Sequence, residues 1–294
     1  MKNDKRVFAL GFFDGVHLGH QALLAECCRL AEELDAQAAA ITFLAHPQSL
    51  FLKEPPLLIS TVRDRELLLR RYGIGPIFKF PATREVMSTP WEAFLDQLQE
   101  FGAVGFVCGD DFHFGFQGQG NSEKVKTYCA RRGIPCAIVP EQALDGIRIS
   151  STYIRRQLET GDMATAVRFL GHPYTLTGRV VRGQQIGRTL GVPTANILLP
   201  EGIVVPKFGV YACRCLVDGQ WYPAVTNIGT RPTVSGTGIT VEPWILDFSG
   251  DLYGKAITLE FHRFLRPERK FPDLETLRQQ IRSDAEETRA ILNR

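Results

Sequence analysis

Two histidines three residues apart, His17 and His20, are the first side chains of this sequence that could do chemistry. They belong to a glycine-punctuated stretch, Gly11–His20, that links a short apolar run to a helical pattern. Residues three apart share a face on a helix. The unpaired amides and the dipole of a helix N-terminus favour an anion, and glycines let a bulky ligand approach the backbone. The stretch therefore predicts a site for a nucleotide phosphate.

A metal-binding pair and a purely structural pair are the alternatives for His17 and His20. No third ligand for a metal is evident in the sequence. A phosphate acceptor is already ionised, so nucleotidyl transfer to it needs no general base. It needs alignment, and it needs donors for the charge that grows on the α-phosphate and on the leaving pyrophosphate. Both imidazoles are therefore candidate catalytic groups.

A second polar cluster lies at residues 148–155. The hydroxyls of Ser151 and Thr152 precede Arg155, and Arg148 stands just before them. Hydroxyls and guanidinium groups together can clamp an anion. The hydroxyls taken alone are equally explained as a helix N-cap.

The second half holds a glycine-rich stretch at residues 183–196. Backbone amides of such a loop can cradle phosphates, but the stretch lacks the lysine of a Walker loop. Thr194 and Asn196 carry hard oxygen ligands two residues apart. In an extended strand they point to the same side, which suits a Mg²⁺ ion that bridges ATP phosphates. A tight turn entering a strand is the alternative.

Glu242 is the candidate general base of the second half. In an extended strand it shares a face with Trp244, Leu246 and Phe248, and a carboxylate on an apolar face is costly without a purpose or a partner. An alcohol is a poor nucleophile until its proton is drawn off, which a positioned carboxylate can do. A salt-bridged glutamate near an edge strand is the alternative. Asp247 is expected on the same strand, facing the other way.

Short apolar runs alternate with helical patterns over residues 1–140. This alternation predicts an α/β domain whose mostly parallel, Rossmann-like sheet is covered by helices on both faces. Ligands bind such sheets at the carboxyl ends of the strands. Gly11–His20 lies at one such end. A loop that carries Asp111, Gly109–Gly115, lies at another, although a simple turn would also explain it. The expected strands are Val7–Leu10, Ala38–Phe43, Ile77–Phe80, Val104–Cys108 and Cys136–Val139, and the expected helices are 20–35, Asp64–Tyr72, Pro90–Phe101, 122–132 and a single helix over 151–170.

From residue 174 the pattern changes to short β-like runs separated by glycine and proline. These runs predict a small antiparallel barrel or sandwich, followed by an amphipathic helix over about 273–291. We therefore expect a first domain over residues 1–158, a linker over 159–173 and a second domain over 174–294.

Composition narrows the class of protein. The chain has 294 residues, 44% apolar and 22% charged, with a net charge of only +2, so we expect no nucleic-acid or membrane partner. The seven cysteines show no C-x-x-C spacing, which indicates free thiols in a reducing compartment. No apolar run approaches the ~20 residues that span a bilayer. We therefore expect a cytoplasmic protein. The sequence does not indicate which proteins, if any, bind it.

Gly11–His20 resembles the ATP signature of the nucleotidylyltransferase superfamily, in the form that bacterial FAD synthetases carry. Residues 149–155 look like the (I/V)-S-S-T-x-I-R motif of that family, whose serine, threonine and arginine hold the ATP triphosphate. Asp111 matches the acidic-or-amide position of its G-x-(D/N)-F-x-F-G loop. The resemblance implies an adenylyltransferase site for ATP and FMN in which His17 and His20 are catalytic. The binding residues would be Gly11, Phe13, Asp14, Gly15, Gly19, Asp111, Arg148, Ser151, Thr152 and Arg155.

Residues 174–294 resemble the riboflavin kinases, which are six-stranded β-barrels that phosphorylate the ribityl 5′-hydroxyl. The resemblance rests on G-R-x-L-G-x-P-T-A-N at residues 187–196 and continues through residues 227–233 and 241–242. It implies that Glu242 is the catalytic base and that Thr194 and Asn196 hold Mg²⁺. The residues that bind ATP would be Gly183, Gly187, Arg188, Pro193 and Thr194.

The two resemblances together are to the prokaryotic bifunctional riboflavin kinases/FMN adenylyltransferases. They imply that MgATP converts riboflavin to FMN and that a second ATP converts FMN to FAD and pyrophosphate. The chain departs from the family pattern at Leu44-Ala45, where the family has Glu-Pro, and at Phe116–Gly120, which lacks an arginine. These departures motivate one alternative, a riboflavin kinase with an impaired or lost adenylyltransferase. A non-enzymatic flavin-binding protein is the other.

Overall fold

The computed structural model of the chain describes residues 4–182, 192–233 and 236–293. The chain divides into two compact units. The first comprises Met1–Leu58 and Val62–Ser151, and the second comprises Ile59–Thr61 and Thr152–Arg294. None of the helices in the described ranges is both long and apolar enough to cross a membrane.

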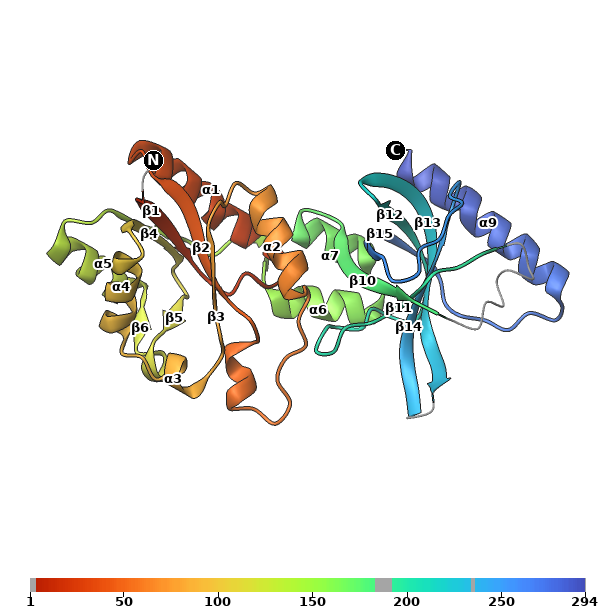
Figure 1. Cartoon of the computed structure of the whole chain (residues 1–294), viewed down its shortest axis with the longest axis horizontal. Helices are drawn as coiled ribbons and strands as arrows, with labels where there is room; N and C mark the ends of the chain where they lie inside the picture. Colours follow the sequence, from red (N-terminus) through yellow and green to blue (C-terminus); the bar gives the residue numbers. More distant parts are fainter. Residues whose placement is uncertain (1–3, 183–191, 234–235, 294) are drawn as a thin grey trace. The chain divides into compact units, whose positions relative to one another are not determined.

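A five-stranded parallel sheet forms the centre of the first unit (Figure 1). Its strands follow the order β3-β2-β1-β4-β7. Their bounds are β1 Arg6–Leu10, β2 Gln37–Phe43, β3 Ile77–Phe80, β4 Ala103–Gly109 and β7 Cys136–Val139. The strand order reverses at β1, which pairs with β2 on one side and with β4 on the other. In open parallel sheets this reversal is where the loops diverge and leave a crevice for a ligand.

Helices cover both faces of this sheet, as the sequence predicts. One hydrophobic core joins α1 and α2 to the strands through Leu24, Cys27 and Leu69. A second core on the opposite face contains Phe94 from α4 and Tyr128 from α5. The helices of this unit are α1 Leu18–Glu33, α2 Val62–Arg71, α3 Arg84–Met87, α4 Trp91–Glu100 and α5 Ser122–Arg132. Its short strands are β5 His113–Phe114, β6 Gly120–Asn121, β8 Ala143–Leu144 and β9 Ile147–Arg148, and its 3-10 turns are η1 Asp14–Val16, η2 Pro47–Leu50 and η3 Phe116–Gly118.

The second unit is a closed antiparallel barrel with the strand order β10-β11-β14-β13-β12-β15. Closure removes the exposed edges that an open antiparallel sheet would leave. The bounds are β10 Tyr174–Val181, β11 Asn196–Leu198, β12 Gly209–Val217, β13 Gln220–Thr233, β14 Gly236–Ile245 and β15 Ala256–Arg266. The terminal helix α9, Leu274–Leu292, packs against β12, β13 and β15. The expected six-stranded barrel with a final helix is confirmed.

Two details of the second half differ from the sequence-based expectation. The single helix expected over residues 151–170 is two helices, α6 Ser151–Thr160 and α7 Met163–Leu170. The break falls at Gly161, which has a φ of +86°, and the Asp162 side chain then caps α7 by accepting the amide of Thr165. Asp247 does not share the strand of Glu242, because β14 ends at Ile245 and Asp247 turns with a φ of +59°.

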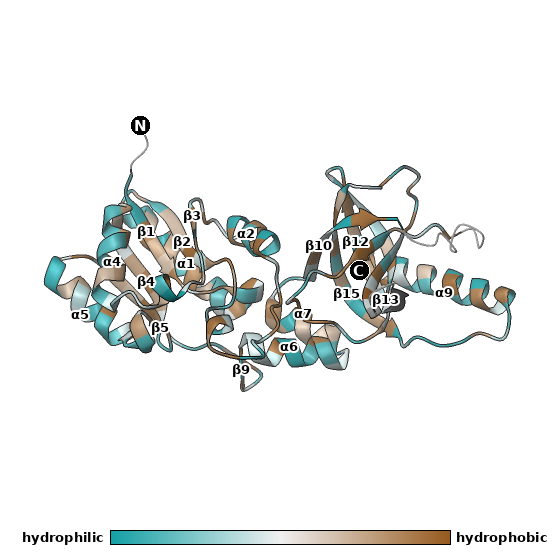
Figure 2. Cartoon of the chain, turned by 60° about the horizontal axis from the view of Figure 1, so that its bottom comes forward, coloured by the Kyte–Doolittle hydropathy of each residue, from teal (hydrophilic) through white to brown (hydrophobic). Residues whose placement is uncertain are grey.

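Hydropathy follows these layers. In Figure 2 the central strands of the first unit are largely hydrophobic, whereas α9 alternates between hydrophobic and hydrophilic residues along its length. The inward side of α9 carries Ala285, which packs with Val210, Val225 and Leu246 of the barrel. All seven cysteines are free thiols, as the spacing predicts.

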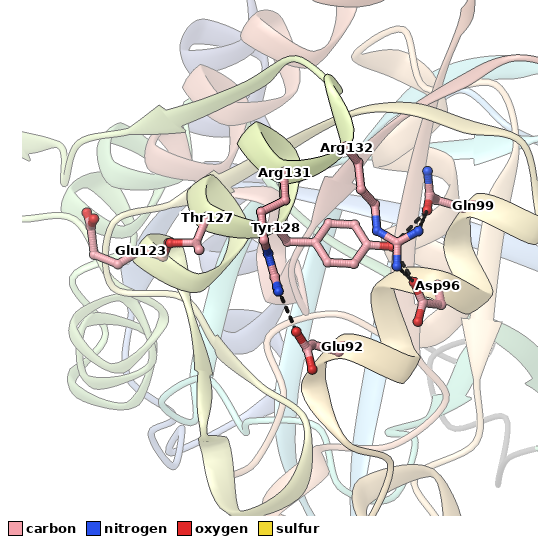
Figure 3. A network of polar contacts seen from close by, with 8 residues as sticks. All are labelled: Glu92, Asp96, Gln99, Glu123, Thr127, Tyr128, Arg131 and Arg132. Carbon is pink, nitrogen blue, oxygen red and sulfur yellow. Dashed lines mark hydrogen bonds and ion pairs between the residues drawn. The ribbon is translucent and has the colours of Figure 1, made fainter.

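A polar network joins α4 to α5 above the second core (Figure 3). The buried Tyr128 donates its hydroxyl to Asp96 Oδ1 at 2.6 Å, and Gln99 Oε1 lies 2.8 Å away. Arg132 stacks on the Tyr128 ring, 4.5 Å from its centroid, and also donates to Asp96 and Gln99. A separate exposed pair, Arg131 with Glu92 at 2.7 Å, flanks the network. Tyr128 therefore fixes the spacing between α4 and α5. The strands that follow these helices, β4 and β7, lead into two of the loops described below.

Tyr128→Phe should lower the free energy of unfolding of the first unit by about 1 kcal/mol, because it removes the hydrogen bond of the tyrosine hydroxyl, while Asp96 and Gln99 keep their bonds to Arg132. Denaturant titration measures the loss. The matched control is Arg131→Ala, which removes only the exposed pair and should change stability by less than about 0.5 kcal/mol. Equal effects of the two substitutions would contradict this account of the network.

Candidate functional site

A cavity of about 340 Å³ opens at the carboxyl end of the parallel sheet, beside the strand-order reversal. Three loops line it, each of which follows a strand of the sheet. They are residues 10–13 after β1, 109–113 after β4 and 139–142 after β7, and residues 148–151 complete the wall. The cavity therefore lies where the sheet topology requires a ligand site.

The turn between β1 and α1 has an unusual backbone. Phe13 has a φ of +60° and Val16 a φ of +42°, and both side chains are fully buried. Such values cost about 1–3 kcal/mol each for residues with a Cβ. The Phe13 ring lies over Gly11, where a Cβ would come within 2.8 Å of its Cζ. The turn is held by its burial, and it presents the backbone of residues 10–13 to the cavity.

The two candidate catalytic histidines are stacked, with ring centroids 3.6 Å apart and an angle of 11° between the planes. His17 is the N-cap of α1, and its Nδ1 accepts the backbone N–H of His20 at 3.3 Å. Because Nδ1 accepts this hydrogen bond, the neutral ring carries its proton on Nε2. His17 can therefore donate from Nε2 at the N-terminus of α1.

His20 is held in its neutral form. Burial lowers its pKa well below the usual value, and the nearby His17 and Arg65 lower it further. Its Nδ1 is buried and has no hydrogen-bond partner among the described residues. With His20 uncharged, the positive groups at the cavity are the N-terminus of α1 and Arg148.

Arg148 lies at the wall of the cavity between two carboxylates. It bonds Asp111 Oδ2 at 2.6 Å and Glu141 Oε1 at 2.5 Å. Ser151 joins the second motif to the first, because its hydroxyl donates to the backbone carbonyl of Asp14 at 3.1 Å. These contacts bring together residues that lie far apart in the sequence.

The structure places most of the sequence-predicted residues of this site at the cavity. Asp14 and Gly15 lie beneath it, buried in η1. Thr152 and Arg155 are in α6, where the Arg155 guanidinium donates to the Thr152 hydroxyl at 3.1 Å. The predicted residues that line the cavity are Gly11, Phe13, His17, Gly19, His20, Asp111, Arg148 and Ser151.

The barrel carries a second polar arrangement around Glu242. Asn227 on β13 lies directly opposite Glu242 on β14. On the other side, Ile197 pairs with Val241 and the bridge between Thr194 and Trp244 keeps the same register, so Asn196 also lies opposite Glu242. Residues paired across antiparallel strands point to the same face. Glu242 is therefore the centre of a row formed by three strands.

Glu268 extends this row, because its Oε1 accepts a hydrogen bond from Asn227 Nδ2 at 3.0 Å. It fits closely against the strand. A Cβ at Gly229 would come within 2.4 Å of Glu268 Oε1. Asp247 is engaged elsewhere, in a two-point ion pair with Arg289 of α9 that lowers the pKa of its carboxyl group.

A second cavity, of about 300 Å³, lies in the second unit, and neither Glu242 nor Asn227 lines it. It is lined by Pro193 and Thr194 together with residues 248–253. Asn196 is buried and does not line it. Three predicted ATP-binding residues, Gly183, Gly187 and Arg188, lie outside the described residues.

Sequence reasoning gave no role to Glu141, Asn227 or Glu268. Glu141 follows β7 and is a partner of Arg148 that no motif announces. Asn227 belongs to the stretch that carries the riboflavin-kinase resemblance, and its place opposite Glu242 depends on the register of the β13–β14 hairpin. The signal that could have found it is a polar residue at an alternating position of a predicted strand.

Comparisons with known proteins cover both units. A family model described as FAD synthetase matches residues 1–153, and one described as riboflavin kinase matches residues 170–292. The bifunctional riboflavin kinase/FMN adenylyltransferase of Pseudomonas fluorescens is 36% identical over 288 residues, covering 97% of this chain and 92% of that protein. The protein of the same name from Listeria monocytogenes is 34% identical over 290 residues, with the same coverage.

A solved structure also matches along nearly the whole chain. It comes from Streptococcus pneumoniae, is described as a macrolide-efflux protein, and covers 98% of this chain and 97% of its own. The TM-score is 0.86 at 30% sequence identity. That similarity supports the fold of both units.

The fold and the two sites define a nucleotide-binding α/β transferase unit joined in one chain to a flavokinase-type barrel. The chain belongs to the family of bifunctional riboflavin kinases/FMN adenylyltransferases. The membership expected from its motifs is thereby confirmed.

The neutral His20 should make the first unit acid-sensitive. In the unfolded chain a histidine takes up a proton below about pH 6.5, whereas the folded His20 has a lowered pKa and does not. The stability that depends on its neutral form is therefore complete above about pH 6.5 and declines as the pH falls, by up to about 1.4 kcal/mol per unit. Hydrogen exchange of the β1 amides between pH 7 and pH 5 measures the slope. His20→Asn should flatten that slope, and an unchanged slope would contradict a neutral His20.

Proposed function

We propose that this chain makes flavin cofactors in two steps: the barrel phosphorylates riboflavin to FMN, and the α/β unit adenylylates FMN to FAD. The observation that carries the proposal is the position of the two family matches. Residues 1–153 fall almost entirely on the first compact unit and residues 170–292 on the second. The first unit has a cavity lined by His17 and His20, and the second has a cavity lined by Pro193 and Thr194.

In the first unit, an oxygen of the FMN phosphate would attack the α-phosphorus of ATP. The bond between that phosphorus and the bridging oxygen breaks, and pyrophosphate leaves. The FMN phosphate is ionised, so the site needs donors and alignment rather than a base. His17 can donate from Nε2, and the N-terminus of α1 favours the same anion. We assign the binding of the remaining phosphates to Arg148, Ser151, Thr152 and Arg155.

We assign the flavin end of FMN to an apolar cavity next to the first one. This cavity measures about 80 Å³ and is lined by Phe43, Phe94, Phe112 and Phe114 among others. Phe112 and His113 line both cavities. Aromatic faces suit the edge of a flat heteroaromatic ring. Neither Leu44 nor Ala45, where the chain departs from the family pattern, lines either cavity.

In the barrel, Glu242 would draw the proton from the ribityl 5′-hydroxyl as that oxygen attacks the γ-phosphorus of ATP. The bond between that phosphorus and the β–γ bridging oxygen breaks, and ADP leaves. A positioned general base typically contributes about 10²–10⁴-fold. Asn227 and Asn196, on either side of Glu242, can hold the hydroxyl or the carboxylate in line. Gly183, Gly187, Arg188, Pro193 and Thr194 are the proposed ATP-binding residues of this site.

The residues of the barrel fit a Mg²⁺ ion that arrives with ATP. Thr194 and Asn196 offer a hydroxyl and an amide oxygen on one side of an extended segment, and both are hard ligands. In the described ranges no group of three or more histidine, cysteine or acidic side chains could hold a metal alone. Magnesium commonly binds through one or two protein ligands plus phosphate oxygens. When bound, it would neutralise charge on the phosphates.

We further propose that the chain works in the cytoplasm on ATP, riboflavin, FMN and FAD, without a nucleic-acid or membrane partner. Seven free thiols and a net charge of +2 support this setting. The proposed domains are residues 1–158 and 174–294, joined by residues 159–173.

Incubation of the purified chain with riboflavin, ATP and Mg²⁺ tests the proposal. Chromatography of the flavins should show FMN first and then FAD. FMN without FAD would instead support a kinase that has lost its adenylyltransferase. Unchanged riboflavin would support a flavin-binding protein without either activity.

The two activities should fail separately. Glu242→Gln should lower the rate of FMN formation by about 10²–10⁴-fold, the contribution of a general base, yet leave FAD formation from added FMN intact. His17→Ala should do the reverse, because it removes a donor that only the first unit uses. Each variant is the control for the other. Loss of both activities in one folded variant would contradict separate sites.

A further inference from the structure

Arg65 is the largest side chain that the first unit buries completely. It projects from α2 and has no exposed surface. Burial lowers its pKa to about 10, and Asp14 opposes part of that shift, so the guanidinium stays charged at neutral pH. A buried charge is costly unless it is well paired. Among the described residues, its Nε and Nη1 have no hydrogen-bond partner. A buried and incompletely paired guanidinium group is costly, so its presence on α2 indicates that Arg65 has a role there.

The contacts of Arg65 lie where β1 and β2 separate. The pairing of these two parallel strands ends at Ala9 with Ala40. Beyond it, Arg65 Nη2 donates to the carbonyl of Phe43 at 2.6 Å, and the guanidinium lies 4.4 Å from the centroid of the Phe12 ring. One side chain thus bridges the ends of two strands just past their last pairing.

Phe12 is the part of this bridge that reaches the cavity. The edge of its ring meets His46 at a centroid distance of 5.1 Å. Its backbone carbonyl accepts the hydroxyl of Thr42 at 2.8 Å. Phe43, the other contact of Arg65, lines the smaller apolar cavity. Arg65 therefore touches one wall residue of each cavity while remaining out of reach of any ligand.

Arg65 also acts on the catalytic turn through charge. It repels a proton from His20, together with His17, and it attracts the carboxylate of Asp14. These groups come from α1, its N-cap and η1. The other charged groups that line the cavity are Asp110, Asp111, Glu141 and Arg148.

We propose that Arg65 is a positioning residue for adenylyl transfer, which fixes Phe12 and the separated ends of β1 and β2 and keeps a positive charge next to η1, against which α2 packs. The proposal rests on the proposed adenylyltransferase. The planar fork of arginine can serve a carbonyl and an aromatic face at once, which the point charge of lysine cannot. Arg65→Lys keeps the positive charge but loses the planar group, whereas Arg65→Met loses both. Comparing the two variants therefore separates the effect of the geometry from the effect of the charge.

Arg6 offers a matched control at the opposite end of β1. It too combines an aromatic face with a backbone carbonyl, since its guanidinium lies 5.7 Å from the Phe78 centroid and donates to the carbonyl of Phe101 at 2.6 Å. Its Nε is likewise buried without a hydrogen-bond partner among the described residues. Arg6→Met removes a similar set of contacts far along the strand from the cavity.

The test measures kcat and KM for FAD formation from FMN, from pH 5.5 to 8.5, in full-length Arg65→Met, Arg65→Lys and Arg6→Met. Arg65→Met should lower kcat about 10–100-fold, the order expected for a misplaced reacting group. It should also move the acid limb of the profile to higher pH, because His20 gains protons more readily without the nearby charge. Arg65→Lys should keep the acid limb of the wild-type profile, but its kcat should be at least five-fold lower than that of the wild type. Arg6→Met should stay within about two-fold of wild type, and the riboflavin kinase activity of all three should be unchanged.

Hydrogen exchange of the β1 and β2 amides reports whether each variant is folded. If Arg65→Met is unfolded, Arg65→Lys decides the question, and a native rate in that variant would overturn the proposal. A folded Arg65→Met with the rate and pH profile of Arg6→Met would overturn it equally. If the wild type makes no FAD at all, the proposed function has failed rather than the role of Arg65.

Discussion

The buried turn between β1 and α1 is the constraint on which the first unit depends. It holds two residues with side chains, Phe13 and Val16, at positive φ inside a hydrophobic core. Such a backbone persists only where packing on all sides leaves no alternative. The two cores, the order of the strands and the bridge from α2 supply that packing. The turn places the N-terminus of α1 and the two stacked imidazoles together at the edge of the sheet.

The barrel solves a different chemical problem with a different device. The proposed phosphorylation of an alcohol needs a carboxylate directed at the substrate hydroxyl. The barrel positions Glu242 by cross-strand register, with an amide-bearing neighbour on each adjacent strand. In the described part of the barrel wall, the alternation of side chains along the strands directs the polar groups. The two halves of the chain therefore illustrate two ways to place polar groups, a strained turn and a paired row.

Much of this architecture follows from the sequence because its signals are local. The bounds of β3, β7 and α5 agree residue by residue with their hydrophobic patterns. The prediction of a single helix over residues 151–170 was wrong. Gly161 has a positive φ that ends the first helix, although apolar residues continue at helical spacing on either side. Motifs placed His17, His20 and Ser151 at one cavity. They did not reveal Glu141 or Glu268, whose roles arise from loops and pairings that meet only after the chain has folded.

The row around Glu242 has a consequence for folding. Asn227 and Glu242 lie on the consecutive strands β13 and β14, whereas Asn196 comes from β11, which reaches β14 only through a pairing between distant parts of the sequence. Such a distant pairing forms late, since the loop must close before the contacts stabilise it. A fragment that lacks β11 cannot complete the row. The appearance of phosphorylated riboflavin during refolding therefore reports the pairing of β11 with β14, by chemistry rather than by spectroscopy.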